Sequence, residues 1–160
     1  GMGTSGSFEV DAAGRPWRAR IHWLGQAQSD GPVLFTETDP AFFVEVRQTT
    51  SRRFALINTV SPNTSEVRLL DRSRLEAPRC VSPRQAGRTY IVDHGRGDDI
   101  EIITNDIHPN FRIVSAPLIH PDRWREVLPP DDRAGGNRRQ SLQLAGHLRP
   151  ECGRPGLFRR

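Results

Sequence analysis

The sequence predicts an all-β fold, a partial β-propeller of about two and a half four-stranded antiparallel blades. Residues 90–130 contain four short segments rich in Ile, Val, Phe, Tyr or Trp, separated by Gly, Pro, Asn or Asp, as in a β-meander. A weaker copy lies 47 residues upstream, and its matching positions are Tyr90 and Phe43, Asn110 and Asn63, Val114 and Val67, and Pro130 and Pro83. Propeller blades repeat at roughly 40–50 residues.

The composition supports the same fold class. Hydrophobic residues make up 35% of the 160 positions, and 13 prolines with 14 glycines predict many turns. These values disfavour an all-helical protein.

The first group of expected strands, within residues 8–37, consists of strands 8–10, 17–24 and 32–36. They resemble the later strands of a blade whose first strand is missing. Polar and apolar residues alternate in the middle strand, which predicts a half-buried strand. Its apolar face holds Trp17, Ala19, Ile21 and Trp23, and its polar face holds Arg18, Arg20 and His22.

Two complete blades are expected next. The blade of residues 42–83 has expected strands 42–46, 54–59, 65–70 and 78–81, and the blade of residues 88–130 has 90–93, 98–105, 110–117 and 124–128. Within 66–70 both faces of the strand carry apolar residues, which is expected if both faces of a blade pack on neighbouring blades.

The two ends of the chain lack the strand pattern. Residues 1–7 (GMGTSGS) are expected to be a linker or an expression remnant. Residues 133–160 carry seven arginines and one acidic residue, Glu151, in a Gly- and Pro-rich background. We expect this tail to be poorly ordered and to be the first segment that a protease removes.

The position of the charge disfavours nucleic acid as a partner. The net charge is +4 and the tail alone contributes +6, so residues 1–132 sum to −2. The sequence has neither an 18-residue apolar run nor a signal-peptide core. Cys80 and Cys152 match neither a metal motif nor a disulfide framework. We therefore expect two free thiols in a soluble, cytoplasmic protein that has no membrane partner.

No catalytic, cofactor-binding or metal-binding residue is predicted. Residues 3–7 (GTSGS) do not form a nucleophile elbow, and Gly95-Arg96-Gly97 is expected to be a hairpin turn. The acidic residues Asp93, Asp98, Asp99 and Glu101 lack a calcium-loop spacing and are expected to be solvated. The histidines His94, His108 and His120 lack a zinc-site spacing, and Trp17, Trp23 and Trp124 are expected to be packed strand residues.

Several blocks resemble, in order, the N-terminal β-propeller of oligopeptidase B (protease II), a branch of the prolyl oligopeptidase family of serine peptidases. They are residues 64–71 (TSEVRLLD), 102–105 (IITN) followed by 110–113 (NFRI), and 124–129 (WREVLP). Residues 39–46 and 10–25 resemble the segments that precede them. The resemblance covers residues 8–132.

The resemblance implies a seven-bladed propeller above an α/β-hydrolase domain that cleaves short peptides after Arg or Lys. The propeller would act as a lid that admits only short peptides. The catalytic Ser, Asp and His belong to the hydrolase domain, which this sequence does not include, so no catalytic residue transfers and we expect the chain to be inactive by itself. Peptides and a hydrolase domain are partners only in the parent enzyme.

Two further expectations concern the isolated chain. Cutting a propeller exposes a face of each terminal blade, which favours self-association. The tail could be a frame-shifted ending, which the DNA after the codon for Asp132 would reveal. The alternative function is a stand-alone β-repeat module that binds a protein partner through its loops.

Overall fold

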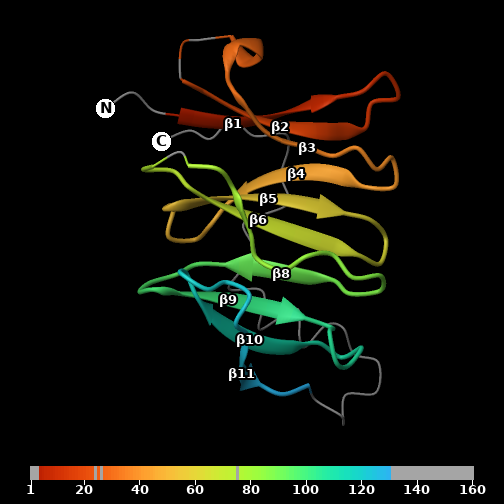
Figure 1. Cartoon of the computed structure of the whole chain (residues 1–160), viewed down its shortest axis with the longest axis vertical. Helices are drawn as coiled ribbons and strands as arrows, with labels where there is room; N and C mark the ends of the chain where they lie inside the picture. The colour runs from red at the N-terminus through yellow and green to blue at the C-terminus, as the bar shows by residue number, and fades with distance from the viewer. Residues whose placement is uncertain (1–3, 24, 26, 75, 131–160) are drawn as a thin grey trace.

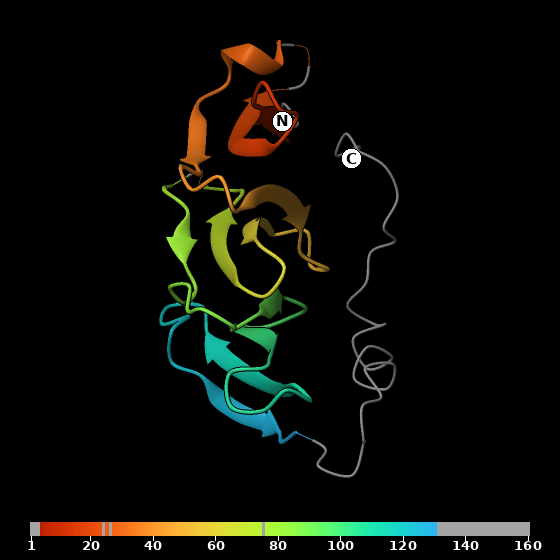
Figure 2. The same cartoon turned by 90° about the vertical axis from the view of Figure 1, so that its right-hand side faces the viewer.

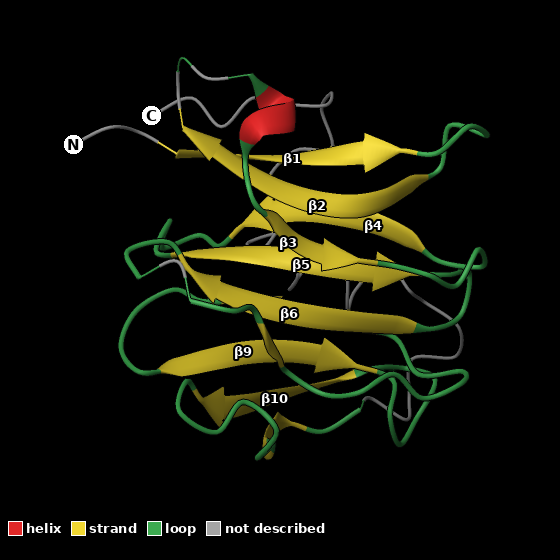
Figure 3. Cartoon of the chain, turned by 45° about the horizontal axis from the view of Figure 1, so that its top comes forward, coloured by secondary structure: helices red, strands yellow, loops and turns green. Residues whose placement is uncertain are grey.

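The computed structural model describes residues 4–23, 25, 27–74 and 76–130. These residues form three antiparallel sheets stacked in chain order, as neighbouring propeller blades are (Figure 1). The view from the side shows the stack as three layers (Figure 2). The helical content of the described residues is one 3₁₀ turn, η1 (Gln28–Asp30), beside the first sheet (Figure 3). The predicted all-β partial propeller is confirmed.

The first sheet has three strands in the order β1 (Thr4–Val10), β2 (Pro16–Trp23) and β3 (Val33–Thr36). β1 starts earlier than predicted, because residues 4–7, expected to be a linker, pair with β2 as far as Thr4 opposite Trp23. The sequence did not predict this part of the strand, because its residues are small and polar and show no apolar alternation. Backbone pairing with β2 holds them in place.

The second and third sheets are complete four-stranded blades. The second has β4 (Phe43–Gln48), β5 (Phe54–Val60), β6 (Ser65–Asp71) and β7 (Arg79–Cys80) in sequence order. The third has β8 (Tyr90–Asp93), β9 (Asp99–Thr104), β10 (Arg112–Pro117) and β11 (Arg125–Leu128), also in sequence order. Every strand of these sheets lies within two residues of its prediction.

The repeat between these sheets is real, but its register differs from the predicted one. Val44 pairs with Thr59, and Tyr90 pairs with Thr104. Both threonines are fully buried on the second strand of their sheet, so they occupy equivalent positions. Tyr90 is therefore the counterpart of Val44 and lies 46 residues after it. The predicted offset of 47 matched Tyr90 with Phe43, but Tyr90 is 2% exposed and Phe43 is 46% exposed. A slip of one residue turns a side chain to the opposite face of its sheet.

The core lies between the sheets. Between the second and third sheets, twelve buried residues form one cluster, to which β5, β6, β9 and β10 contribute. Between the first and second sheets, Ala19 packs with Val44 and Ile57. Both faces of β6 are buried, since Val67 and Leu69 face the third sheet while Glu66 and Leu70 are also buried. The predicted burial of both faces of the blade is confirmed.

His22 lies in a different environment from the predicted one. It was expected on the exposed face of β2, but it is only 6% exposed. After η1 the chain turns back over β2, and a Cβ added to Gly31 would lie 1.7 Å from the carbonyl oxygen of Ile21. Only glycine allows so close an approach. The returning turn covers His22.

Some predictions concern residues outside the described part of the chain. The ordering of the tail 133–160, the thiol of Cys152 and the side chain of Trp23 belong to this group. Within the described residues, no helix has the length and hydrophobicity needed to cross a membrane.

Candidate functional site

The third sheet is attached to the second by a buried carboxylate at the end of β8. Asp93 Oδ1 accepts hydrogen bonds from the backbone N–H groups of Thr50 (2.8 Å) and His94 (2.7 Å), and Asp93 Oδ2 accepts one from the Thr50 hydroxyl (2.5 Å). Asp93 was predicted to be solvated at a hairpin tip, but it is 7% exposed. It joins the β4–β5 loop to the β8–β9 loop.

The neighbouring His94 is also buried, and it bonds to Ser51. Its Nδ1 lies 2.7 Å from Ser51 Oγ and its Nε2 lies 3.1 Å from the carbonyl oxygen of Gly97. A carbonyl only accepts, so Nε2 donates to Gly97, and in the neutral ring Nδ1 is then the acceptor for the Ser51 hydroxyl. Its ring packs edge-on against Phe54, with 4.9 Å between ring centroids.

The Ser51–His94 pair has the distance of a catalytic pair but not its arrangement. In a serine triad a carboxylate bonds the second ring nitrogen and orients the ring. Here the Asp93 carboxylate bonds backbone and Thr50 groups, and the second ring nitrogen faces a carbonyl. The arrangement therefore fits a structural joint between two loops, and we assign it no hydrolytic chemistry.

A second buried charge joins the first sheet to the second. Glu37, just after β3, is 4% exposed and bonds the guanidinium of Arg84. That guanidinium stacks on the ring of Phe42 at 3.9 Å and lies 3.3 Å from the Thr59 hydroxyl. The bond from Glu37 contributes to a raised pKa of Arg84, although burial opposes it. Glu66 accepts from the backbone N–H of Arg84 at 2.9 Å.

Tyr90 anchors β8 in the second sheet. Its hydroxyl accepts from the N–H of Val67 at 2.9 Å and donates to the carbonyl of Ser82 at 2.5 Å, and its backbone N–H donates to Ser65 Oγ at 2.8 Å. Burial raises the pKa of the Tyr90 phenol well above its usual range. The ring meets Trp124 edge-on, which confirms Trp124 as a packed indole.

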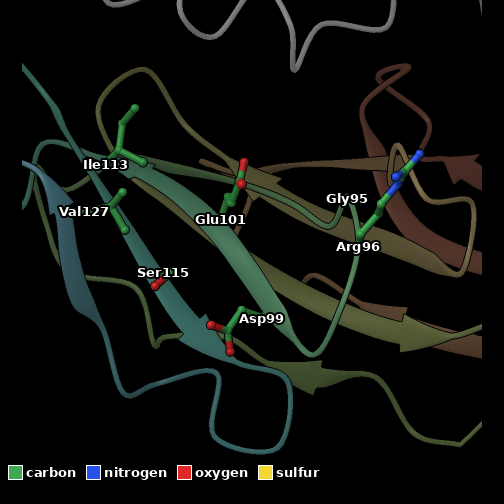
Figure 4. A pocket seen from close by; sticks show the side chains of 7 residues that line it. All are labelled: Gly95, Arg96, Asp99, Glu101, Ile113, Ser115 and Val127. Carbon is green, nitrogen blue, oxygen red and sulfur yellow. The ribbon is translucent and has the colours of Figure 1, made fainter.

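A hollow lies on the face of the third sheet that points away from the second. It has a volume of about 340 Å³ and is open to solvent (Figure 4). The residues that line it are Gly95, Arg96, Asp99, Glu101, Ile113, Ser115 and Val127. Asp99 pairs with Arg125 at 2.6 Å, whereas no side-chain partner of Glu101 lies among the described residues. The hollow is a shallow part of a sheet face.

The remaining candidates from the sequence are dispersed. Asp98, Asp99 and Glu101 are exposed, as predicted. His108 accepts a hydrogen bond from the N–H of Asn110, and His120 is exposed in the β10–β11 loop. Among the described residues, no three His, Cys, Asp or Glu side chains lie together in a group that could hold a metal ion. Cys80 is a free thiol, and burial raises its pKa.

Sequence comparison assigns the family. Residues 11–137 match the prolyl oligopeptidase N-terminal β-propeller domain. The chain belongs to the prolyl oligopeptidase family. It is 32% identical to Protease 2 of Moraxella lacunata over 110 residues, and this alignment covers 68% of the chain. It is 43% identical over 75 residues, 46% of the chain, to a prolyl endopeptidase-like protein of Xenopus laevis.

Solved structures of the family superpose on the three sheets. Oligopeptidase B from Trypanosoma brucei, with covalently bound antipain in a closed form, matches 81% of the chain with a TM-score of 0.74 and 30% identity. Oligopeptidase B from Leishmania major matches 80% with the same TM-score and 26% identity. The chain spans only 19% and 18% of those two proteins, 16% of Protease 2 and 11% of the Xenopus protein.

Proposed function

We propose that these three sheets are part of a propeller that admits short peptides, and excludes long chains, at a hydrolase domain cleaving after Arg or Lys. The match of residues 11–137 to the family's propeller domain is the observation that carries this proposal. The similarity to Protease 2 and to oligopeptidase B supports the choice of this branch.

The contacts between the sheets fit a steric filter. A filter must keep its opening narrow, so its blades must not separate under the pull of a longer substrate. Asp93, Glu37 and Tyr90 each bond across a boundary between sheets, and each is less than 8% exposed. Buried charge-assisted bonds are costly to break. These residues contribute rigidity, and the chemistry of cleavage belongs to the hydrolase domain.

A chimaera tests this proposal. Residues 11–130 replace the matching segment of Moraxella lacunata Protease 2, and kcat/KM is measured for a short dibasic fluorogenic peptide and for an unfolded chain of about a hundred residues carrying the same cleavage site. We expect cleavage of the short peptide and at least about a hundredfold preference for it over the long chain.

Opening the joint between the sheets should weaken this preference. In the chimaera, Asp93→Ala removes the bonds to Thr50 and should raise cleavage of the long chain relative to the short peptide. Asp98→Ala, at an exposed neighbouring carboxylate, is the matched control and should leave the ratio unchanged. A chimaera that cleaves both substrates equally before any substitution would contradict the filter.

A further inference from the structure

A small crevice lies between the first strands of the second and third sheets. It has a volume of about 40 Å³, and β4, β5 and β8 contribute its walls. β4 and β8 are the edge strands of their sheets and lie on the same side of the stack (Figure 2). The residues that line the crevice are Arg47, Gln48, Leu56, Asn58, Ile91, Val92 and Asp93. Its two walls therefore belong to adjacent blades.

The backbone of Val92 brings an unpaired donor and an unpaired acceptor to this crevice. The N–H and C=O of Tyr90 point out of the edge of the third sheet, because both bond Ser65 Oγ, at 2.8 and 2.9 Å. These directions alternate along an antiparallel edge strand, so the N–H and C=O of Val92 point out of the same edge. No described residue bonds them. Val92 is only 8% exposed, and unpaired backbone groups at such positions are rare.

The side chain of Asn58 brings a second unpaired amide to the same crevice. Asn58 lies in β5, where it pairs with Glu45 of β4 and Val67 of β6. Its side-chain amide has no hydrogen-bond partner within the described part of the chain. An asparagine amide both donates and accepts, as the backbone of Val92 does. The two walls thus present matching neutral groups to one space.

The charged side chains at the crevice already have partners. Arg47 pairs with Glu45 at 3.1 Å, and the Asp93 carboxylate is bonded to Thr50. The apolar part of the wall includes Leu56, which is buried. A group that fits this environment is small and neutral and both donates and accepts hydrogen bonds. A peptide amide has these properties, whereas a guanidinium or carboxylate would find no unpaired counter-charge.

We propose that this crevice binds the backbone of an extended peptide, whose N–H and C=O pair with Val92 while a neighbouring amide bonds Asn58. Pairing of a peptide with a strand edge is a common mode of recognition, and it reads the backbone instead of the side chains. The inference rests on the proposed function, because the peptide is one that passes through the filter. So few hydrogen bonds give a dissociation constant of about 1–10 mM.

Nuclear magnetic resonance of the ¹⁵N-labelled full chain tests the site directly. The probe is tetra-alanine with both ends blocked. It should shift the backbone amide signal of Val92 and the side-chain amide signals of Asn58 with one dissociation constant. The side-chain amide of Asn63, which is exposed in the β5–β6 loop, should not shift. The same peptide with methylated backbone nitrogens cannot donate, so it should bind at least about tenfold more weakly.

A pair of asparagine variants gives the matched comparison. Asn58→Leu removes the amide and should raise the dissociation constant of tetra-alanine about fivefold, as judged from the Val92 signal. Asn63→Leu should leave it unchanged. Circular dichroism of both variants checks that the sheets are intact. Equal binding by the methylated peptide, or no shift up to about 20 mM, would overturn the site and leave its polar groups to water.

The chimaera with Protease 2 separates a failure of this site from a failure of the filter. There Asn58→Leu should raise KM for the short peptide about fivefold with kcat unchanged, and the long chain should remain excluded. An unchanged KM would overturn the contact without touching the filter. Equal cleavage of the short and long substrates would contradict the filter alone, because the spectral shifts are measured without a hydrolase domain.

Discussion

Removal of the Asp93 carboxylate should measurably lower the stability of the fold, because it is a buried acceptor. Its carboxylate holds three donors, two of them from Thr50 in the neighbouring sheet. Asp93→Ala leaves these donors without their acceptor in a buried site and should lower the free energy of unfolding by about 2–3 kcal/mol. Denaturant melts of the full chain measure this change.

The exposed Asp98 supplies the comparison for that measurement. Asp98→Ala should change the free energy of unfolding by less than about 0.5 kcal/mol, because surface substitutions away from specific contacts have small effects. Equal losses for the two alanine variants would show that the bonds across the sheets contribute no net stability.

Asp106 and Arg112 should give the chain a dependence on acid. Two hydrogen bonds from the Arg112 guanidinium, at 2.9 and 2.7 Å, hold the pKa of Asp106 below 3.8. A carboxyl whose pKa is lower in the folded state stabilises the fold above the unfolded pKa, and this stabilisation is lost as the pH falls through the folded value. Stability should therefore fall below about pH 4 through this group.

The variant Asp106→Asn isolates that contribution. It removes the titrating carboxyl, so the difference in unfolding midpoint between wild type and variant should be present at pH 7 and should shrink at pH 3. A difference that is constant over this range would mean that Asp106 does not carry the acid dependence.

Residue environments were predicted only where a local pattern determined them. The alternation of β2 correctly placed Ala19 and Ile21 in the core. It failed for His22, because the covering turn returns over β2 through Gly31. Asp93 was expected to be solvated at a hairpin tip, and its burial depends on Thr50, 43 positions away. The neighbouring His94 is buried against Ser51, also 43 positions away. No spacing in the sequence reports such a contact.

At the scale of elements, the first sheet should be the least firmly attached. It has three strands, and one of its charged contacts to the second sheet is the ion pair of Glu37 with Arg84. Arg84→Met keeps much of the packing on Phe42 but leaves the Glu37 carboxylate buried without its cation. We expect the free energy of unfolding to fall by about 2 kcal/mol. The fall is no larger because Arg84 is partly exposed and solvent screens its charge.

Hydrogen exchange should show where that loss acts. In Arg84→Met, amides of β1–β3 should exchange faster, while amides of β8–β10 should keep their protection. The double variant Glu37→Gln with Arg84→Met removes the stranded charge and should recover part of the stability. Uniformly faster exchange across all three sheets would contradict a local role for this ion pair.

Strand positions were predicted far better than the relation between blades. Turn residues such as Pro62-Asn63 and Pro109-Asn110 mark the loops between strands, and each strand of the two complete blades was found within two residues. The repeat did not show which side chains of each strand face the core. Offsets of 46 and 47 residues both align similar residue types in the two blades, although they place opposite faces of a strand together. Only the pairing of Val44 with Thr59 and of Tyr90 with Thr104 decides between them.

For the whole molecule, the three sheets form one stack held by an apolar core and by a few buried polar joints. The family assignment could be anticipated from ordered blocks of sequence, and the propeller match over residues 11–137 confirms it. The buried polar joints between the sheets could not be anticipated, because they connect residues that lie far apart in the sequence.

The most direct test of the central claim is to assay the isolated chain beside the chimaera with the same dibasic fluorogenic peptide, with and without a serine-reactive phosphonate. We expect background turnover from the isolated chain, because Ser51 and His94 lack the oriented carboxylate of a triad. We expect phosphonate-sensitive turnover from the chimaera. Turnover by the isolated chain that the phosphonate abolishes, with the label on a serine between residues 4 and 130, would contradict the assignment of these sheets as a filter without hydrolytic chemistry.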